Sequence, residues 1–136
     1  MICYAVIDTN VLVSALLSSK DDSATVQVLS KVLTGEIIPV YSNVITKEYR
    51  EVLSRKKFGF AGGTIDYLLS AIEKYGILVN PSPSGIILPD MKDLPFYEVV
   101  LEKRDDEAYL VTGNIKHFPK EPFVVTPREL LDILER

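Results

Sequence analysis

A short apolar run near the N-terminus of the chain ends abruptly in polar residues. Residues 3–7 carry no charged side chain, and Asp8, Thr9 and Asn10 follow them. A short run without polar alternation is typical of a strand that is buried on both faces, as in a parallel sheet. Open α/β sheets hold their ligands at the carboxyl ends of such strands. The sequence therefore predicts that Asp8 faces a functional site.

Strands and helices alternate along the rest of the chain. Further strands are predicted at residues 37–41, 77–79, 108–112 and 123–125. Helices are predicted at residues 11–17, 23–34, 43–55 and 64–75, from about residue 95, and from 127 to 134. This alternation predicts an α/β fold, a three-layer α/β/α sandwich with a central parallel sheet of about five strands. A length of 136 residues fits one domain, residues 1–136.

Composition narrows the class of protein. Apolar residues make up 47% of the chain and charged residues 25%, so we expect a folded domain rather than disorder. The net charge of −4 argues against a broad basic surface for nucleic acid. It does not exclude a nucleic-acid enzyme, because metal ions held by carboxylates can bring phosphate to an acidic site.

The sequence also bears on location. There is no secretory signal, and no apolar run approaches membrane-spanning length. Cys3 is the only cysteine, so no disulfide can form within the chain. We therefore expect no membrane association and a cytoplasmic location.

Glu48 stands on the predicted buried face of the helix at residues 43–55. At 100° per residue, this face contains Val44, Ile45, Tyr49, Val52 and Leu53. A carboxylate on such a face is costly unless it is paired or binds a metal. Pairing with a buried arginine is the structural alternative.

Two further polar residues stand at the ends of predicted elements. Asp93 precedes the helix that starts near Pro95, and Asn114 lies just beyond the strand at residues 108–112. Taken alone, Asp8 could cap a helix, and Asp93 and Asn114 could be cap or turn residues. Brought together, three carboxylates repel one another, and Mg²⁺ or Mn²⁺ relieves that repulsion. Such ions favour metal-dependent hydrolysis of nucleic acid.

A basic stretch follows the same helix. Arg55, Lys56 and Lys57 adjoin Phe58 and Phe60. Basic and aromatic side chains together can contact a single strand, although a basic helix end is more often simply solvated. His117 is the lone histidine, and without a second histidine or cysteine a zinc site is not expected.

With these residues assembled, the chain resembles the PIN-domain family, in particular the group described as toxin components of toxin–antitoxin pairs. Four separated blocks carry the resemblance. They are residues 7–15 (IDTNVLVSA), residues 48–53 (EYREVL) with Arg55 and Phe58, residues 90–96 (DMKDLPF), and residues 111–114 (VTGN) with residues 116–118 (KHF).

The resemblance implies a sheet in the order 3-2-1-4-5 and an endoribonuclease that depends on Mg²⁺ or Mn²⁺. It implies an RNA substrate, an antitoxin partner and a homodimer. The residues it assigns are Asp8, Glu48 and Asp93 as catalytic metal ligands, Asn114 as a further ligand, Asn10, Asp90 and Thr112 in support, and Arg55, Lys56, Lys57, Lys116 and His117 as RNA contacts.

Two departures from the family pattern keep a second function open. Asn114 and Ala108 stand where acids are common. A neutral amide holds a metal more weakly than a carboxylate does. The alternative is a weak or inactive PIN-type module that binds RNA or a protein partner. A receiver-like or phosphatase-like domain is disfavoured, because Asn10 and Asn80 stand where those folds need acids.

Overall fold

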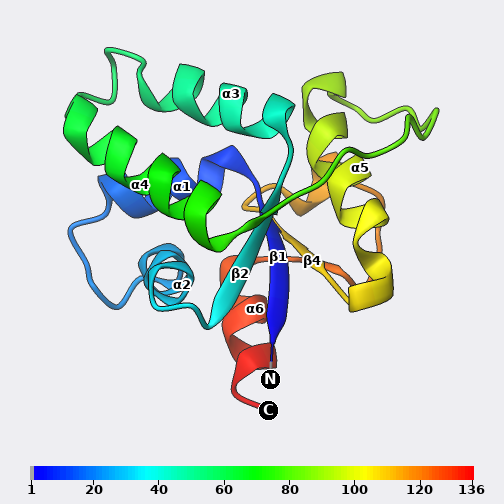
Figure 1. Cartoon of the computed structure of the whole chain (residues 1–136). Helices are drawn as coiled ribbons and strands as arrows, with labels where there is room; N and C mark the ends of the chain where they lie inside the picture. Colours follow the sequence, from blue (N-terminus) through cyan, green and yellow to red (C-terminus); the bar gives the residue numbers. More distant parts are fainter. Residues whose placement is uncertain (1) are drawn as a thin grey trace.

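The computed structural model describes residues 2–136, and its centre is a parallel sheet (Figure 1). The strand order is β3-β2-β1-β4-β5, which confirms the predicted order. Ala5 of β1 lies opposite Pro39 of β2 and Tyr109 of β4. The strands are β1 (Cys3–Ile7), β2 (Ile37–Tyr41), β3 (Ile77–Leu78), β4 (Tyr109–Val111) and β5 (Val124–Val125).

The first strand is central because its residues can be buried on both faces. Ala5 and Val6 are fully buried and Ile7 is 1% exposed. In the neighbouring strands, Ile37, Val40, Leu110 and Val111 are also fully buried. A strand without polar alternation can be covered on both sides only in the middle of a layered fold.

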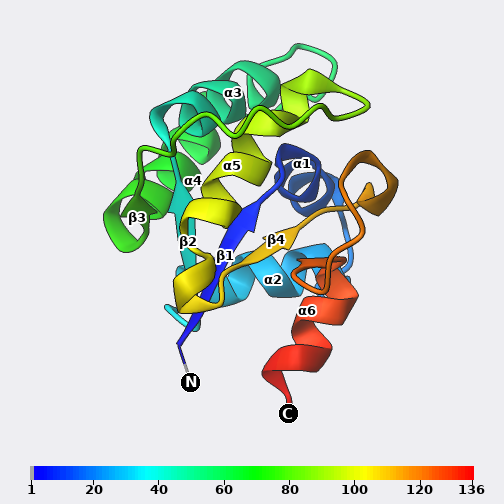
Figure 2. The ribbon, with the colours of Figure 1, turned by 90° about the vertical axis from the view of Figure 1, so that its right-hand side faces the viewer.

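Helices cover both faces of the sheet (Figure 2). Helix α5 packs against β1, β2 and β4, whereas α2 and α6 pack against each other on the other face. Helix α3 contacts α1, α4 and α5, and it lies across the upper end of the strands in Figure 1. The helices are α1 (Thr9–Leu17), α2 (Ala24–Leu33), α3 (Asn43–Leu53), α4 (Gly62–Tyr75), α5 (Leu94–Glu102) and α6 (Pro127–Leu134).

The predicted elements are all present, and their ends differ by one or two residues. Helix α3 ends at Leu53 instead of residue 55, and α4 begins at Gly62 instead of residue 64. Strand β4 is one residue shorter at each end than predicted. Residues at the ends of a helix or strand make fewer backbone hydrogen bonds than residues in its middle. Differences of one or two residues at element ends are therefore usual.

The predicted buried face of α3 was wrong for Val44, which is 60% exposed. The buried stripe is Ile45, Tyr49 and Leu53, spaced four residues apart. At 100° per residue, Val44 lies about 100° and Glu48 about 60° from Ile45, on the side of the stripe away from Tyr49. Glu48 is accordingly half-buried rather than enclosed.

Among the described residues, none of the helices combines the length and apolar composition needed to cross a membrane.

Candidate active site

Asp8 follows β1 at the carboxyl edge of the sheet. Its backbone N–H donates to the Val111 carbonyl at 2.9 Å, which extends the β1–β4 ladder by one residue. It occupies the N-cap position of α1, yet its side chain makes no capping hydrogen bond. The residue is only 5% exposed. The carboxylate is therefore buried for a reason other than helix capping.

Two predicted supporting residues hold one oxygen of that carboxylate. Thr112 donates its hydroxyl to Asp8 Oδ2 at 2.8 Å, and Asn10 Nδ2 donates to the same atom at 3.2 Å. The Thr112 hydroxyl also accepts the Asn114 N–H at 2.9 Å. Asn10 Oδ1 accepts the Gly113 N–H at 3.1 Å. The loops after β1 and β4 are thus tied together around Asp8.

Glu48 approaches the same edge from α3. Thr9 donates its hydroxyl to Glu48 Oε2 at 2.5 Å. Within residues 2–136, Glu48 makes no salt bridge with a lysine or arginine. The alternative of a buried Glu48–arginine pair therefore does not describe this structure.

Asp93 lies in a 3₁₀ turn, Met91–Asp93, that leads into α5. Its Oδ2 atom is buried and has no hydrogen-bond partner. His117 Nδ1 lies 3.3 Å from this atom, an electrostatic contact without hydrogen-bond alignment. Asp90, by contrast, is exposed and accepts the Lys92 N–H at 2.9 Å, so it caps the turn.

The three acids lie close enough to influence one another's ionisation. Burial, with smaller contributions from the charges of Asp93 and Glu48, raises the pKa of Asp8 to about 6, and the Thr112 hydrogen bond opposes this rise. Burial and Asp93 raise the pKa of Glu48. Burial and the charge of Asp90 raise the pKa of Asp93, whereas His117 lowers it. Three carboxyl groups thus lie where burial disfavours their charged forms.

This arrangement suits a hard divalent cation. Its donor set is carboxylate oxygen, and Asp93 Oδ2 is buried without a hydrogen-bond partner. Mg²⁺ and Mn²⁺ prefer oxygen ligands of this kind. Within residues 2–136, however, no three acidic, histidine or cysteine side chains converge closely enough to enclose an ion as they stand. The acids are neighbours whose charges interact, as their raised pKa values indicate.

Of the predicted RNA contacts, His117 lies beside Asp93, and the charge of Arg55 lowers the pKa of Glu48. Asn114 is exposed, and its side chain makes no hydrogen bond within the described part of the chain. Lys116 and His117 belong to the exposed 3₁₀ turn that follows it, Ile115–His117. The backbone N–H of Asn114 is therefore linked to Asp8 through the Thr112 hydroxyl, whereas the Asn114 side chain is not.

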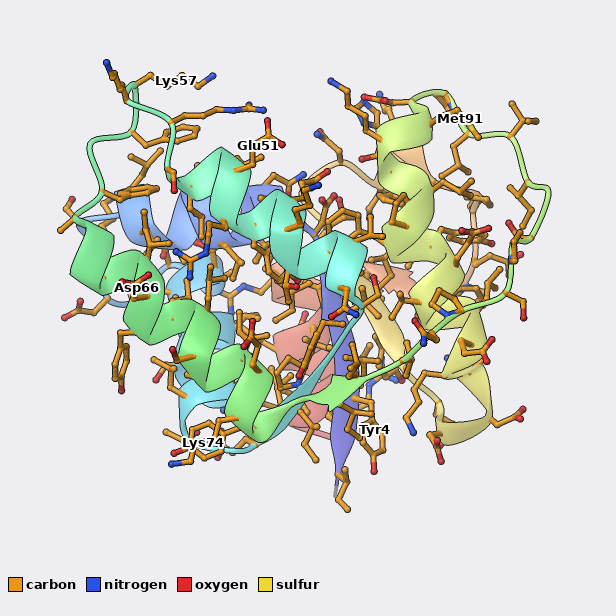
Figure 3. All side chains as sticks on the ribbon, turned by 45° about the horizontal axis from the view of Figure 1, so that its top comes forward. Tyr4, Glu51, Lys57, Asp66, Lys74 and Met91 are labelled. Carbon is orange, nitrogen blue, oxygen red and sulfur yellow. The ribbon has the colours of Figure 1, made fainter. Side chains whose placement is uncertain are left out.

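The basic loop after α3 is exposed at Arg55, Lys56 and Lys57. Phe58 and Phe60 stack on each other, with ring centroids 5.5 Å apart, and Lys57 Nζ lies 5.2 Å from the Phe58 centroid. Figure 3 shows Lys57 on the opposite side of the molecule from Met91, where the turn of Asp93 begins. The loop therefore lies away from that turn, and its two aromatic rings already contact each other.

Sequence reasoning missed two residues that position the site. Thr9 was considered only as a polar residue after the strand, yet it holds Glu48. Tyr49 was assigned to the core, yet its hydroxyl also donates to the Ile7 carbonyl at 2.5 Å. A buried tyrosine needs a hydrogen-bond partner. Because Tyr49 follows Glu48 in the sequence, its need for a partner could have indicated that α3 contacts β1 beside Glu48.

Replacing Thr112 with valine should lower the free energy of unfolding by about 1–3 kcal/mol. The substitution keeps the shape and removes the hydroxyl that bonds the buried Asp8 carboxylate. Urea unfolding measures the change. Thr64→Val is the matched control, because Thr64 is exposed and makes no side-chain hydrogen bond. Equal midpoints for the Thr112 variant and the wild type would show that this hydrogen bond contributes nothing.

The comparison with known proteins agrees with the geometry. A family model described as PIN domain matches residues 4–116. The match includes Asp8, Glu48, Asp93 and Asn114. No curated protein and no solved structure matches the chain. Because the model covers most of the sequence, the chain belongs to the PIN domain family.

Proposed function

We propose that this protein is a metal-dependent endoribonuclease that hydrolyses RNA phosphodiester bonds. PIN domains are commonly nucleases and typically use divalent metals. The observation that carries the proposal is that three acids, Asp8 buried and Glu48 and Asp93 partly buried, lie near one another at the carboxyl edge of the sheet. Asp8, Glu48 and Asp93 come from three separate segments, and each has its pKa raised by burial and by a neighbouring acid.

Asp8, Glu48 and Asp93 would hold the cation. When bound, Mg²⁺ or Mn²⁺ supplies positive charge beside the phosphodiester and makes a water more acidic. The chain's own residues orient the ligands for this task. Thr112 and Asn10 fix Asp8 Oδ2, and Thr9 fixes Glu48 Oε2. Hydrogen bonds of this kind hold ligands in place and tune the metal.

A specific observation supports the second candidate, a PIN-type module that binds RNA or a protein partner without cleaving. Asn114 stands where the family often has an acid, and its exposed side chain makes no hydrogen bond to the three acids. The site therefore has one negative charge fewer to hold a second cation. A protein that binds RNA with metal but leaves it intact would fit this candidate.

The cellular role we propose is that of the toxin in a toxin–antitoxin pair. The support is the resemblance of the four motif blocks to that group of proteins. The proposal includes a cytoplasmic location, a homodimer and a protein antitoxin. A gene for a small DNA-binding protein next to this one would support the role, and an isolated gene would count against it.

The test of the nuclease is cleavage of a mixed single-stranded RNA pool. Cleavage should require Mg²⁺ or Mn²⁺, should stop with EDTA, and should fall to background in Asp8→Asn, Glu48→Gln and Asp93→Asn. Glu51→Gln is the matched control for Glu48→Gln, because Glu51 is on the same helix but exposed and paired with Arg55. Cleavage by Asp93→Asn at the wild-type rate would remove Asp93 from the mechanism.

A further inference from the structure

A small cavity opens beside Asp8. Its volume is about 270 Å³, and it lies between α1, the first turn of α2 and the loop after β4. It shares Asn10 and Gly113 with the acidic site, since Asn10 donates to Asp8 Oδ2 and accepts the Gly113 N–H. The lining residues are Asn10, Val11, Ser14, Thr25, Gly113 and Asn114.

The cavity has uncharged walls with unused polar groups. None of the six lining residues is charged. The side chains of Ser14, Thr25 and Asn114 make no hydrogen bonds within residues 2–136. Three other cavities on the surface each include two acids together with at least one lysine or arginine, and none of them is lined by Asn10 or Gly113. The uncharged cavity is therefore the one that a strand passing Asp8 reaches without meeting further acids.

The size of the cavity fits part of a nucleotide. Pockets for whole small-molecule ligands have volumes of roughly 300–1,000 Å³. A volume of about 270 Å³ therefore suits a single ring system. Val11 is buried and supplies apolar surface, while the Asn114 amide offers a donor and an acceptor. Single-stranded RNA is read through such contacts to the edges of exposed bases.

Gly113 joins the cavity to the acidic site through Asn10. Its N–H donates to Asn10 Oδ1 at 3.1 Å, and a Cβ atom at this position would lie 3.4 Å from that oxygen.

We propose that this cavity seats one base of the RNA strand that passes Asp8 and discriminates among the four bases. The inference rests on the proposed function, because that function supplies the strand. In this role, Asn114 is a base-reading residue rather than a metal ligand. This explains an amide at a position where the family often has an acid.

The first arm of the test measures cleavage preference. Wild type is incubated with Mn²⁺ and a randomised single-stranded RNA library, and the cleaved ends are sequenced. We expect a preferred base at one position near the cleaved bond. Ser14→Ala and Thr25→Val should each reduce the preference about threefold, and together about tenfold, since each removes one hydrogen-bonding group. The matched controls are Ser70→Ala and Thr64→Val on α4, which are exposed and should leave the preference unchanged.

The second arm needs no cleavage. Fluorescent RNA tetranucleotides that differ in one base are titrated into the wild type in EDTA, and anisotropy gives their affinities. A base preference that Ser14→Ala and Thr25→Val reduce supports the cavity even if the wild type cleaves nothing, in which case only the nuclease proposal fails. Cleavage or binding with no base preference, or with a preference that both variants retain, overturns the cavity and leaves the nuclease proposal intact.

Discussion

Asp8→Asn should raise the free energy of unfolding of the metal-free protein by about 2–3 kcal/mol at neutral pH. Asp8 is 5% exposed, and burial together with neighbouring acids raises its pKa from 3.8 to about 6. A shift of that size corresponds to about 3 kcal/mol at a pH above both values. Asparagine removes the charge but keeps a carbonyl oxygen that can accept the hydrogen bonds from Thr112 and Asn10.

The sign of the pH dependence follows from proton binding. Between pH 4 and 6 the folded protein binds more protons at Asp8 than the unfolded chain does. Stability from this group is therefore fully present below about pH 4 and is lost as the pH rises through 6. The advantage of Asp8→Asn should be near zero at pH 4 and should reach its full size by pH 7. Urea unfolding in EDTA across this range measures it.

The control for this prediction is Asp132→Asn. Asp132 is exposed and makes no salt bridge within the described residues, so its replacement should change stability by less than about 0.5 kcal/mol. A clear loss of stability in Asp8→Asn at neutral pH would contradict the prediction. It would mean that the Asp8 carboxylate stabilises the start of α1 as a structural anion.

The main layout of the fold follows from local sequence patterns. The uncharged run Cys3–Ile7 predicted a strand buried on both faces, and its central place in the sheet confirms this. The capping box of Thr126 and Glu129 at the start of α6 is equally local, and both of its hydrogen bonds form. Such signals can be read from sequence because each depends on residues within one turn or one strand.

Features that depend on distant segments were harder to predict. The exposure of Val44 reflects how α3 sits across the sheet edge, which helical periodicity alone does not specify. The Thr9–Glu48 hydrogen bond joins residues 39 positions apart. The contact of Asp93 Oδ2 with His117 likewise depends on two loops that meet only in the folded chain.

The candidate site lies between these extremes. Asp8, Glu48 and Asp93 were selected for their positions and by family resemblance. In the described residues they lie near enough for their charges to interact but not near enough to enclose an ion. Sequence could not reveal that the Asn114 side chain would make no hydrogen bond to these acids and that the residue would line a cavity. A residue after a strand can face either side of the sheet edge, and the choice depends on the backbone angles of the loop, here φ −125° and ψ 65° at Asn114.

Manganese should stabilise the wild-type protein strongly, and Asp8→Asn should abolish the gain. A ligand that binds only the folded state at 100 times its Kd adds about 2.7 kcal/mol to the free energy of unfolding. For a chain of this length, that corresponds to a rise in Tm of about 6–12 °C. Thermal unfolding is measured without Mn²⁺ and with Mn²⁺ at about 10 times and about 100 times its Kd. This measurement does not depend on RNA cleavage.

Three comparisons make this result specific to the acidic site. Asp93→Asn should lose most of the gain, because Asp93 Oδ2 is the buried oxygen that lacks a partner. Glu51→Gln and Asp132→Asn should keep it, because both carboxylates are exposed and stand outside the site. The opposite sign of the two Asp8→Asn effects is the decisive feature. The same substitution should stabilise the metal-free protein and remove its response to Mn²⁺, since the Asp8 charge, which burial and the neighbouring acids disfavour, is the source of both. An equal Tm rise in wild type and Asp8→Asn would place Mn²⁺ elsewhere on the surface and would leave the buried acids without a cation to explain them.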